Sequence, residues 1–401
     1  MSQQDASSQE QDTLTDLRGA WGLALIPLLL LGLVLALLTT TGGGLTALSG
    51  PPIEHVVIER VILPGPGVIE LTVVNDGPQP VTIPQVIVDD AYTYFTASPG
   101  TTIPRLGRAT YTLSYPWVEE EAHAVVLLTS LGATFSTEIA AAVQSPQLSG
   151  SLLLQFALIG LYVGVVPVGL GMLWYPFMRR LSAQAMNFIL ALTVGLLIYL
   201  ALGTWFDANE FAAELPAFWQ GGPLVPLLAL VSLGALLAVG ATGKRAPELN
   251  LGLSYRIALG IGLHNLGEGL AIGAAFAAGE AALGTFLVLG FTLHNITEGV
   301  GIAAPIIRTN PGLRHFVLLI MLAGGPAILG TWLGGFAFDP VLATIFLAIG
   351  IGAILQVVWE VGRLVVRRSV SAGLSAFSPV NLLGVAAGLA LMYFTAFMVK
   401  F

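Results

Sequence analysis

The chain has 401 residues, of which 55% are hydrophobic and 9% are charged, and its formal net charge is −8. Soluble domains carry about 25% charged residues, so this composition excludes a soluble globular protein and predicts an integral membrane protein. The chain has no cysteine, which excludes disulfide bonds and thiolate metal ligands. Imidazole, carboxylate, amide and water remain as metal ligands, and no nucleic-acid partner is expected.

The N-terminal part divides into three segments. Residues 1–20 are polar and acidic, which predicts a disordered cytoplasmic tail. Residues 21–41 contain a Leu-rich run that is long enough to span a bilayer, and we interpret it as a transmembrane anchor. A cleaved signal peptide is the alternative, but the acidic residues before the run do not form a positively charged leader region. The Thr/Gly-rich residues 42–52 then form a linker.

Residues 53–146 change character and predict a β-domain. Runs such as 68–74 alternate apolar and polar residues, and turn sequences NDGP and SPG separate such runs. About seven strands of this kind suggest a small all-β sandwich that resembles immunoglobulin-like or fibronectin-like modules. We expect this sandwich outside the cell, and the sequence does not identify its extracellular partner.

The region 150–401 predicts an α-helical membrane domain. Its apolar runs are long enough to cross a bilayer, and short polar segments separate them. The eight predicted spans are at about 150–175, 184–204, 222–241, 253–278, 282–306, 315–337, 341–362 and 380–399.

The charges between the spans predict their orientation. Basic residues fall in alternate predicted loops, at Arg179, Arg180, Lys244, Arg245, Arg308, Arg314, Arg363, Arg367 and Arg368. The opposite loops contain acidic residues and no Lys or Arg. The positive-inside rule then predicts a multi-pass protein of the cell membrane with a cytoplasmic N-terminus and an extracellular β-sandwich and C-terminus.

Three acidic residues, Asp207, Glu210 and Glu214, follow the second span in a predicted outer loop. One interpretation is an ordinary solvated loop. The other is an entrance that concentrates cations, because a negative mouth raises the local cation concentration.

Two copies of one hexad, HNLGEG and HNITEG, lie within the fourth and fifth predicted spans. His264 and Glu268 are four residues apart and therefore share one helix face, and His294 and Glu298 repeat this spacing. A short loop joins the spans, so the helices are antiparallel and the two histidines lie at similar depth. Ionisable groups near the bilayer midplane are costly and usually mark a site or a pathway, so we predict a divalent-metal site.

The residues beside these histidines extend the prediction. Asn265 and Asn295 can supply amide oxygens to a metal, or can orient its ligands from a second layer of contacts. The alternative for the four charged or titratable residues is that each His–Glu pair only cross-links helices inside the bundle. Repetition of the motif at matched depth favours the metal site.

Paired HNxxEG hexads in consecutive spans resemble the ZIP (Zrt/Irt-like) family of divalent metal-ion transporters, over roughly residues 150–401. This resemblance implies an eight-helix bundle and metal uptake toward the cytoplasm by elevator-like alternating access. It implies that His264, Glu268, His294 and Glu298 hold the principal ion. Asn265 and Asn295 would form a second, adjoining site with the same two carboxylates.

The sequence departs from the family pattern in several places. Gly267 and Thr297 stand where the family hexad has proline, and Thr297 can bond back to a helix carbonyl. Gly325 stands where a family segment has glutamate, so the sequence leaves open whether the centre holds one ion or two. The short segment 242–248 replaces the family's long histidine-rich loop.

The seventh span carries Gln356 and, one turn later, Glu360. Their functional interpretation is an exit pathway for the metal. The alternative for Glu360 is a carboxylate that reaches the interface or pairs with Arg363.

These observations together predict divalent-metal transport rather than an enzyme, with no resident cofactor and with the metal as cargo. Two histidines favour zinc, whereas iron, manganese and cadmium remain open. The alternatives are an intramembrane metalloenzyme and a metal-responsive receptor that acts through the β-sandwich. Partners are the metal ion and the lipid membrane, and a homodimer is left open.

Overall fold

The computed structural model describes residues 25–40, 53–241 and 249–399, in two compact units that divide between Ile53 and Glu54. The first unit contributes an apolar helix, Leu25–Thr40, which lies inside the predicted anchor 21–41. The predicted tail 1–20 and linker 42–52 fall outside the described residues. That this helix crosses a membrane stays a prediction.

The β-region forms two four-stranded antiparallel sheets and one small strand pair. The first sheet has the order β1 (Val56–Gly65), β2 (Val68–Asn75), β8 (Arg108–Ser114), β6 (Phe95–Ser98). The second has the order β10 (Thr134–Ile139), β9 (His123–Leu128), β4 (Gln85–Val88), β5 (Ala91–Thr93), and β3 (Val81–Thr82) pairs with β7 (Thr102–Ile103). Alternate residues of both sheets, such as Leu71 and Leu127, are buried in one shared core.

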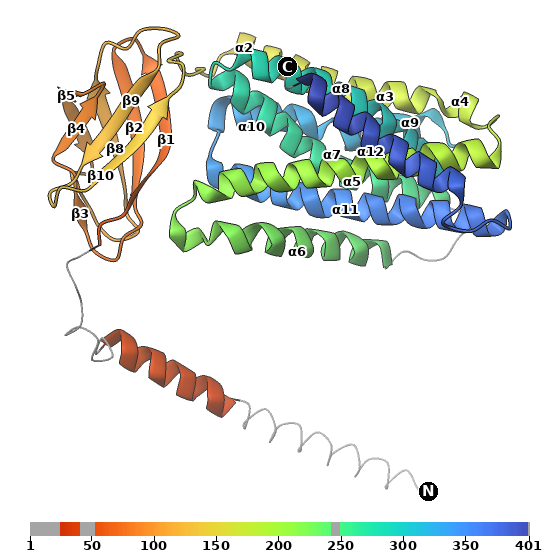
Figure 1. Ribbon diagram of the computed structural model, residues 1–401, viewed down its shortest axis with the longest axis horizontal. Coiled ribbons are helices and arrows are strands. Elements are labelled where there is room, and N and C mark those ends of the chain that lie inside the picture. The colour runs from red at the N-terminus through yellow and green to blue at the C-terminus, as the bar shows by residue number, and fades with distance from the viewer. Residues whose placement is uncertain (1–24, 41–52, 242–248, 400–401) are drawn as a thin grey trace, which may run out of the picture. The chain divides into compact units, whose positions relative to one another are not determined.

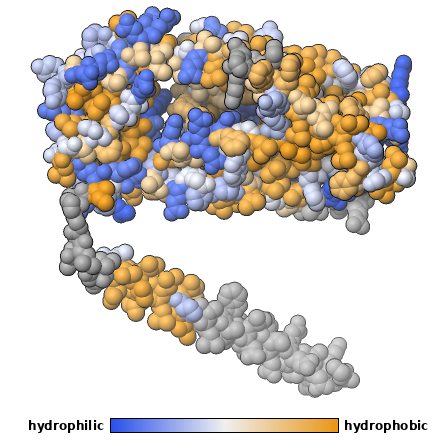
Figure 2. Space-filling model, in the orientation of Figure 1, coloured by the Kyte–Doolittle hydropathy of each residue, from blue (hydrophilic) through white to orange (hydrophobic). Residues whose placement is uncertain are grey.

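Eight helices among the described residues are long and apolar enough to cross a membrane, as predicted (Figure 1). The first span consists of α2 (Gly150–Gly160), the π-helical turn η2 (Leu161–Val165), α3 (Val166–Leu173) and α4 (Tyr175–Met178). The next four are α5 (Ala183–Ala213), η3 (Ala217–Trp219) with α6 (Gly221–Ala241), α7 (Leu249–Ala277), and α8 (Ala281–Ala303) with η4 (Ala304–Ile306). The last three are α9 (Leu313–Gly324) with α10 (Pro326–Ala337), α11 (Pro340–Ser371) and α12 (Pro379–Val399). Hydrophobic residues cover most of the helical surface that faces the viewer in Figure 2. This is the surface of a multi-pass membrane protein.

Two of these helices, α5 and α11, extend well past their predicted C-terminal ends. Helix α5 continues to Ala213, so Asp207 and Glu210 lie on a helix rather than in a loop. Helix α11 continues to Ser371 and carries all three arginines that were assigned to the following loop. Helical hydrogen bonding continues past the apolar run because Ala, Glu and Arg are good helix formers. Helix α5 ends before Pro216, and Gly373, with φ of +70°, follows the end of α11.

Helix α7 packs against α8, α10 and α11, and α5 and α11 run side by side (Figure 1). Glycines of both hexads permit close packing. A Cβ atom on Gly269 would lie 2.2 Å from the Ala327 carbonyl oxygen of α10, and one on Gly299 would lie 2.2 Å from the Val168 carbonyl oxygen of α3. Neither position tolerates a side chain, so the hexad glycines fix how closely α7 and α8 approach their neighbours.

Candidate metal centre

The centre is built by one turn of α7 and one turn of α8. The helices follow each other through a tight connection at Gly279, whose φ of +81° suits glycine. On α7, Nε2 of His264 lies 3.0 Å from Oε1 of Glu268, one helical turn away. From α8, Nε2 of His294 lies 2.8 Å from the same carboxylate oxygen. Glu268 is therefore the residue on which the two imidazoles converge.

These three side chains are removed from solvent, with relative exposures of 3% for His264, 3% for Glu268 and 5% for His294. One ligand atom from each lies within 4.8 Å of the others. Two ligands that are each about 2.0 Å from a tetrahedral zinc ion stand about 3.3 Å apart. The observed separations thus need only small side-chain adjustments to surround a dication, and no other group of three His, Asp or Glu residues in the described part of the chain meets this criterion.

The two asparagines attach the centre to neighbouring helices. Nδ2 of Asn295 donates to the carbonyl of Val163, in the π-helical turn, at 2.9 Å, and it lies 3.3 Å from Oε2 of Glu268. Nδ2 of Asn265 donates to the carbonyl of Ala323 on α9 at 3.0 Å. Each amide oxygen is buried without a hydrogen-bond partner among the described residues. Both asparagines therefore keep an oxygen available for a cation.

Glu298 is the fourth of the predicted principal ligands. The structure brings three of the four predicted principal ligands together, and Glu298 lies outside that group, one turn beyond His294 on α8. Its relative exposure is 1%, and within the described chain neither of its carboxylate oxygens has a hydrogen-bond partner. A buried carboxylate without a partner is costly unless a cation or a proton neutralises it.

Thr297 behaves as the sequence predicted, since its hydroxyl donates to the carbonyl of His294 at 2.7 Å. This bond satisfies the hydroxyl locally and leaves α8 helical through the hexad. Helix α7 is likewise continuous through Gly267.

The predicted exit residues lie on α11. Gln356 is 1% exposed, and neither atom of its amide has a partner among the residues that the structure describes. Glu360 pairs with Arg256 of α7, with 3.0 Å between Oε1 and Nε. The alternative pairing with Arg363 was wrong, because the guanidinium of Arg363 lies over the Trp359 ring instead, 5.5 Å from its centroid.

The acidic residues of the predicted entrance are exposed on α5, where Glu214 caps the helix end. They are not part of the three-residue group at the centre.

Sequence reasoning missed Arg256 and the carbonyls of Val163 and Ala323. Arg256 could have been noticed as a charge inside a span, whereas backbone carbonyls have no signature in a sequence.

No protein-family model matches this chain, and no curated protein matches its sequence. The fold and the site define the class of the molecule, a multi-pass helical membrane protein with a buried His/Glu cluster.

Proposed function

We propose that this protein transports a divalent metal ion, with zinc favoured, through the centre between α7 and α8, in the manner of the ZIP family that its hexads resemble. The observation that carries this proposal is the convergence of His264 and His294 on Glu268 in a buried position. The unpartnered oxygens of Asn265, Asn295 and Glu298 support it, because they are oxygen ligands left without a protein donor.

The burial of the centre favours transport over a static surface site. With exposures of 5% or less, the three ligands cannot exchange a metal ion with solvent unless the helices around them move. Alternating access by elevator-like movement of one helix group against another would open the centre to each side in turn. Only the seven residues 242–248 lie between α6 and α7, so a long loop that binds metal is missing at this point of the sequence.

The hydrogen bonds at the centre suggest how metal and proton movements are linked. An imidazole Nε2 must carry a proton to donate to Glu268, and it must be free of that proton to bind a metal. Metal binding through Nε2 therefore shifts each imidazole proton to Nδ1 or releases it. Where the proton is released, metal uptake would depend on pH.

For orientation we propose that the basic residues face the cytoplasm and that the β-region and C-terminus face outside, following the positive-inside rule. The metal would move toward the cytoplasm.

Gly325 lies at the junction of α9 and α10 and supplies no carboxylate, which favours one strongly held ion.

The test is uptake of zinc by purified protein in liposomes that contain a fluorescent zinc indicator. Glu268→Ala and His294→Ala should each abolish uptake, because each removes one member of the converging group. Glu280→Gln, which alters an exposed carboxylate in the connection between the same helices, is the matched control and should retain uptake.

Three outcomes would contradict the proposal. Uptake that survives in Glu268→Ala would show that the centre is not the path of the metal. Hydrolysis of a substrate without accumulation of metal would indicate a metalloenzyme. Loss of zinc-dependent activity on deletion of residues 53–146 alone would favour the receptor, whereas transport predicts surviving flux. Iron, manganese and cadmium compete in the same assay and identify the preferred ion.

A further inference from the structure

Three arginines surround a polar hollow at the C-terminal end of α11. Arg367 and Arg368 of α11 and Arg308, which follows η4, line this hollow, whose volume is about 360 Å³. The start of α5 at Ala183 and Asn250 at the start of α7 complete its wall. We call this hollow the basic pocket. None of the residues of the metal centre lines it.

Within the described part of the chain, the arginines of the basic pocket have no carboxylate partner. None of Arg308, Arg367 and Arg368 forms an ion pair with any carboxylate in the described residues. Arg368 is nevertheless fixed, because its Nε donates to Oδ1 of Asn187 at 3.2 Å, and Nδ2 of Asn187 donates to the hydroxyl of Ser369 at 3.0 Å. One edge of its guanidinium is thus held by a buried polar network, and its terminal amino groups stay available for an anion.

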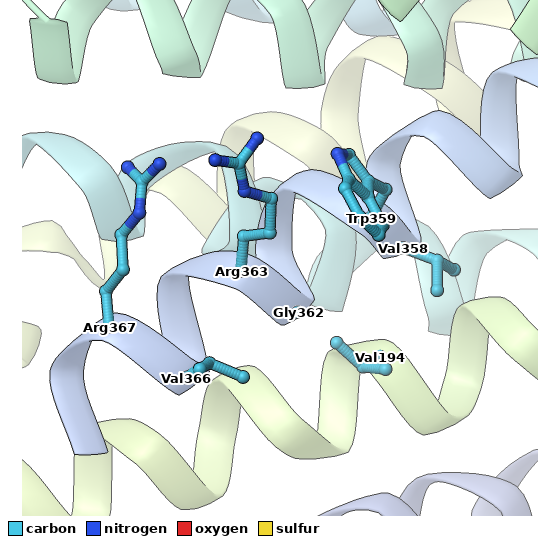
Figure 3. Close-up of a pocket in the computed structure, with 7 residues that line it drawn as sticks. All are labelled: Val194, Val358, Trp359, Gly362, Arg363, Val366 and Arg367. Atoms are coloured by element: carbon cyan, nitrogen blue, oxygen red, sulfur yellow. The ribbon is translucent and has the colours of Figure 1, made fainter. Parts of the chain in front are cut away.

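A second hollow, also about 360 Å³, adjoins the basic pocket through Arg367, which lines both. This apolar groove lies between α5 and α11 and is lined by Val194, Val358, Trp359, Gly362 and Val366, with Arg363 and Arg367 beside them. In Figure 3 the side chains of Trp359, Arg363 and Arg367 project from the same side of α11. From Trp359 to Arg367 the groove extends about 12 Å along the helix, at 1.5 Å per residue.

The order of these features along α11 matches an amphiphile. The cations lie near the helix end at Ser371, and the apolar groove extends from them toward the middle of the span. A soluble anion would bind arginines but would leave the groove and the half-exposed Trp359 uncovered. A lipid with a phosphate group would satisfy both parts, because arginine binds phosphate oxygens in bidentate fashion and acyl chains cover apolar surface.

We propose that an anionic glycerophospholipid of the surrounding membrane binds here, with its phosphate group among Arg308, Arg367 and Arg368 and one acyl chain in the groove beside Trp359. The site does not depend on the metal centre. Gly362 lines the groove, and a Cβ atom on it would meet no atom within 4 Å, so the groove has room for a chain at this point.

The test uses Trp359 as a reporter in lipid nanodiscs of phosphatidylcholine. The discs contain a small fraction of either dibrominated phosphatidylglycerol or dibrominated phosphatidylcholine, and Trp359→Phe supplies the background of the other tryptophans. The Trp359 signal should be quenched several-fold more by the brominated anionic lipid. The double variant Arg308→Gln/Arg367→Gln should remove this preference, whereas Arg314→Gln, an exposed arginine on α9, should retain it.

A second measurement guards against a variant that fails to fold. Native mass spectrometry of detergent-purified protein with added phosphatidylglycerol should show one retained lipid. Gly362→Leu should lose this lipid because its side chain fills the groove, and Gly203→Leu, at another helical position with open space, should keep it. Equal quenching by the two lipids, retention of the preference in the arginine double variant, or displacement of the lipid by inorganic phosphate alone would each overturn the proposal.

Discussion

Two of the His–carboxylate clusters among the described residues have different surroundings. In the β-region, Oδ2 of Asp89 accepts from Nδ1 of His123 at 2.6 Å and from the Tyr115 hydroxyl at 2.7 Å, and Oδ1 accepts from the Ala124 N–H at 2.9 Å. Nε2 of His123 in turn accepts from the Val118 N–H. Every polar atom of this cluster has a protein partner. Such a cluster fixes strands and turns, and nothing in it is left over for a ligand.

The helical cluster around Glu268 is only partly satisfied. The amide oxygens of Asn265 and Asn295 and both carboxylate oxygens of Glu298 lack donors among the described residues, although all are buried. Unsatisfied buried acceptors cost stability, and a cation is the ligand that offsets this cost. Completeness of hydrogen bonding, rather than the presence of histidine and carboxylate, separates a structural cluster from a candidate site.

Among variants that leave the three converging ligands intact, neutralising Glu298 should lower zinc affinity the most. Glu298→Gln keeps the size of the side chain and removes a buried carboxylate whose oxygens have no hydrogen-bond partner among the described residues. We expect zinc affinity to fall by more than about 100-fold, beyond the roughly 10–100-fold typical of groups that only orient ligands. The metal-free protein should become more stable, on the order of 1–3 kcal/mol. Zinc titration and thermal unfolding in detergent measure the two effects. Lower stability together with unchanged zinc affinity would identify Glu298 as structural.

Removing Asn295 should have an intermediate effect. Asn295→Ala leaves the Val163 carbonyl without its donor and releases the contact with Glu268. We expect a loss of zinc affinity of about 10–100-fold, as for residues that orient metal ligands. The control is Asn209→Ala, which removes an asparagine whose one side-chain hydrogen bond among the described residues is to the Trp205 carbonyl, one turn away on α5. Equal affinities of the two variants for zinc would contradict the role of Asn295.

A change in the fully hydrogen-bonded cluster of Asp89, His123 and Tyr115 should alter the stability of the β-region and leave metal transport unchanged. Burial alone would raise the pKa of Asp89, but the hydrogen bonds from His123, Ala124 and Tyr115 outweigh burial and hold that pKa below its usual value. A carboxyl whose pKa is depressed by folding stabilises the fold above its unfolded pKa, and this stabilisation is lost as the pH falls through the folded pKa.

Asp89→Asn should therefore lower the stability of the β-region at neutral pH, and that stability should depend less on pH. Hydrogen–deuterium exchange of peptides from residues 81–128, followed from pH 7 downward in the full chain, measures this change. The matched control is Asp90→Asn, because Asp90 is an exposed neighbour that also has a positive φ. Zinc uptake should be the same in both variants, and a loss of uptake in Asp89→Asn alone would break the distinction between the two clusters.

Much of the architecture was predictable because its cause is local. An apolar run of about 20 residues has few stable forms other than a membrane helix, and all eight predicted spans are present. That His264 and Glu268 lie on the same helix face follows from their four-residue spacing alone. The ends of α5 and α11 were less predictable, because polar residues with good helix propensity extend a helix beyond its apolar part.

The site divides in the same way. The sequence by itself determined that imidazoles and carboxylates would lie at similar depth on adjacent helices, since spacing and loop length set this. Only the tertiary structure decided that His294 reaches Glu268, that Glu298 lies outside the group, and that Glu360 pairs with Arg256. Those outcomes depend on how closely glycine-rich helix faces approach and how they are rotated. Such quantities are set by contacts between residues far apart in the chain.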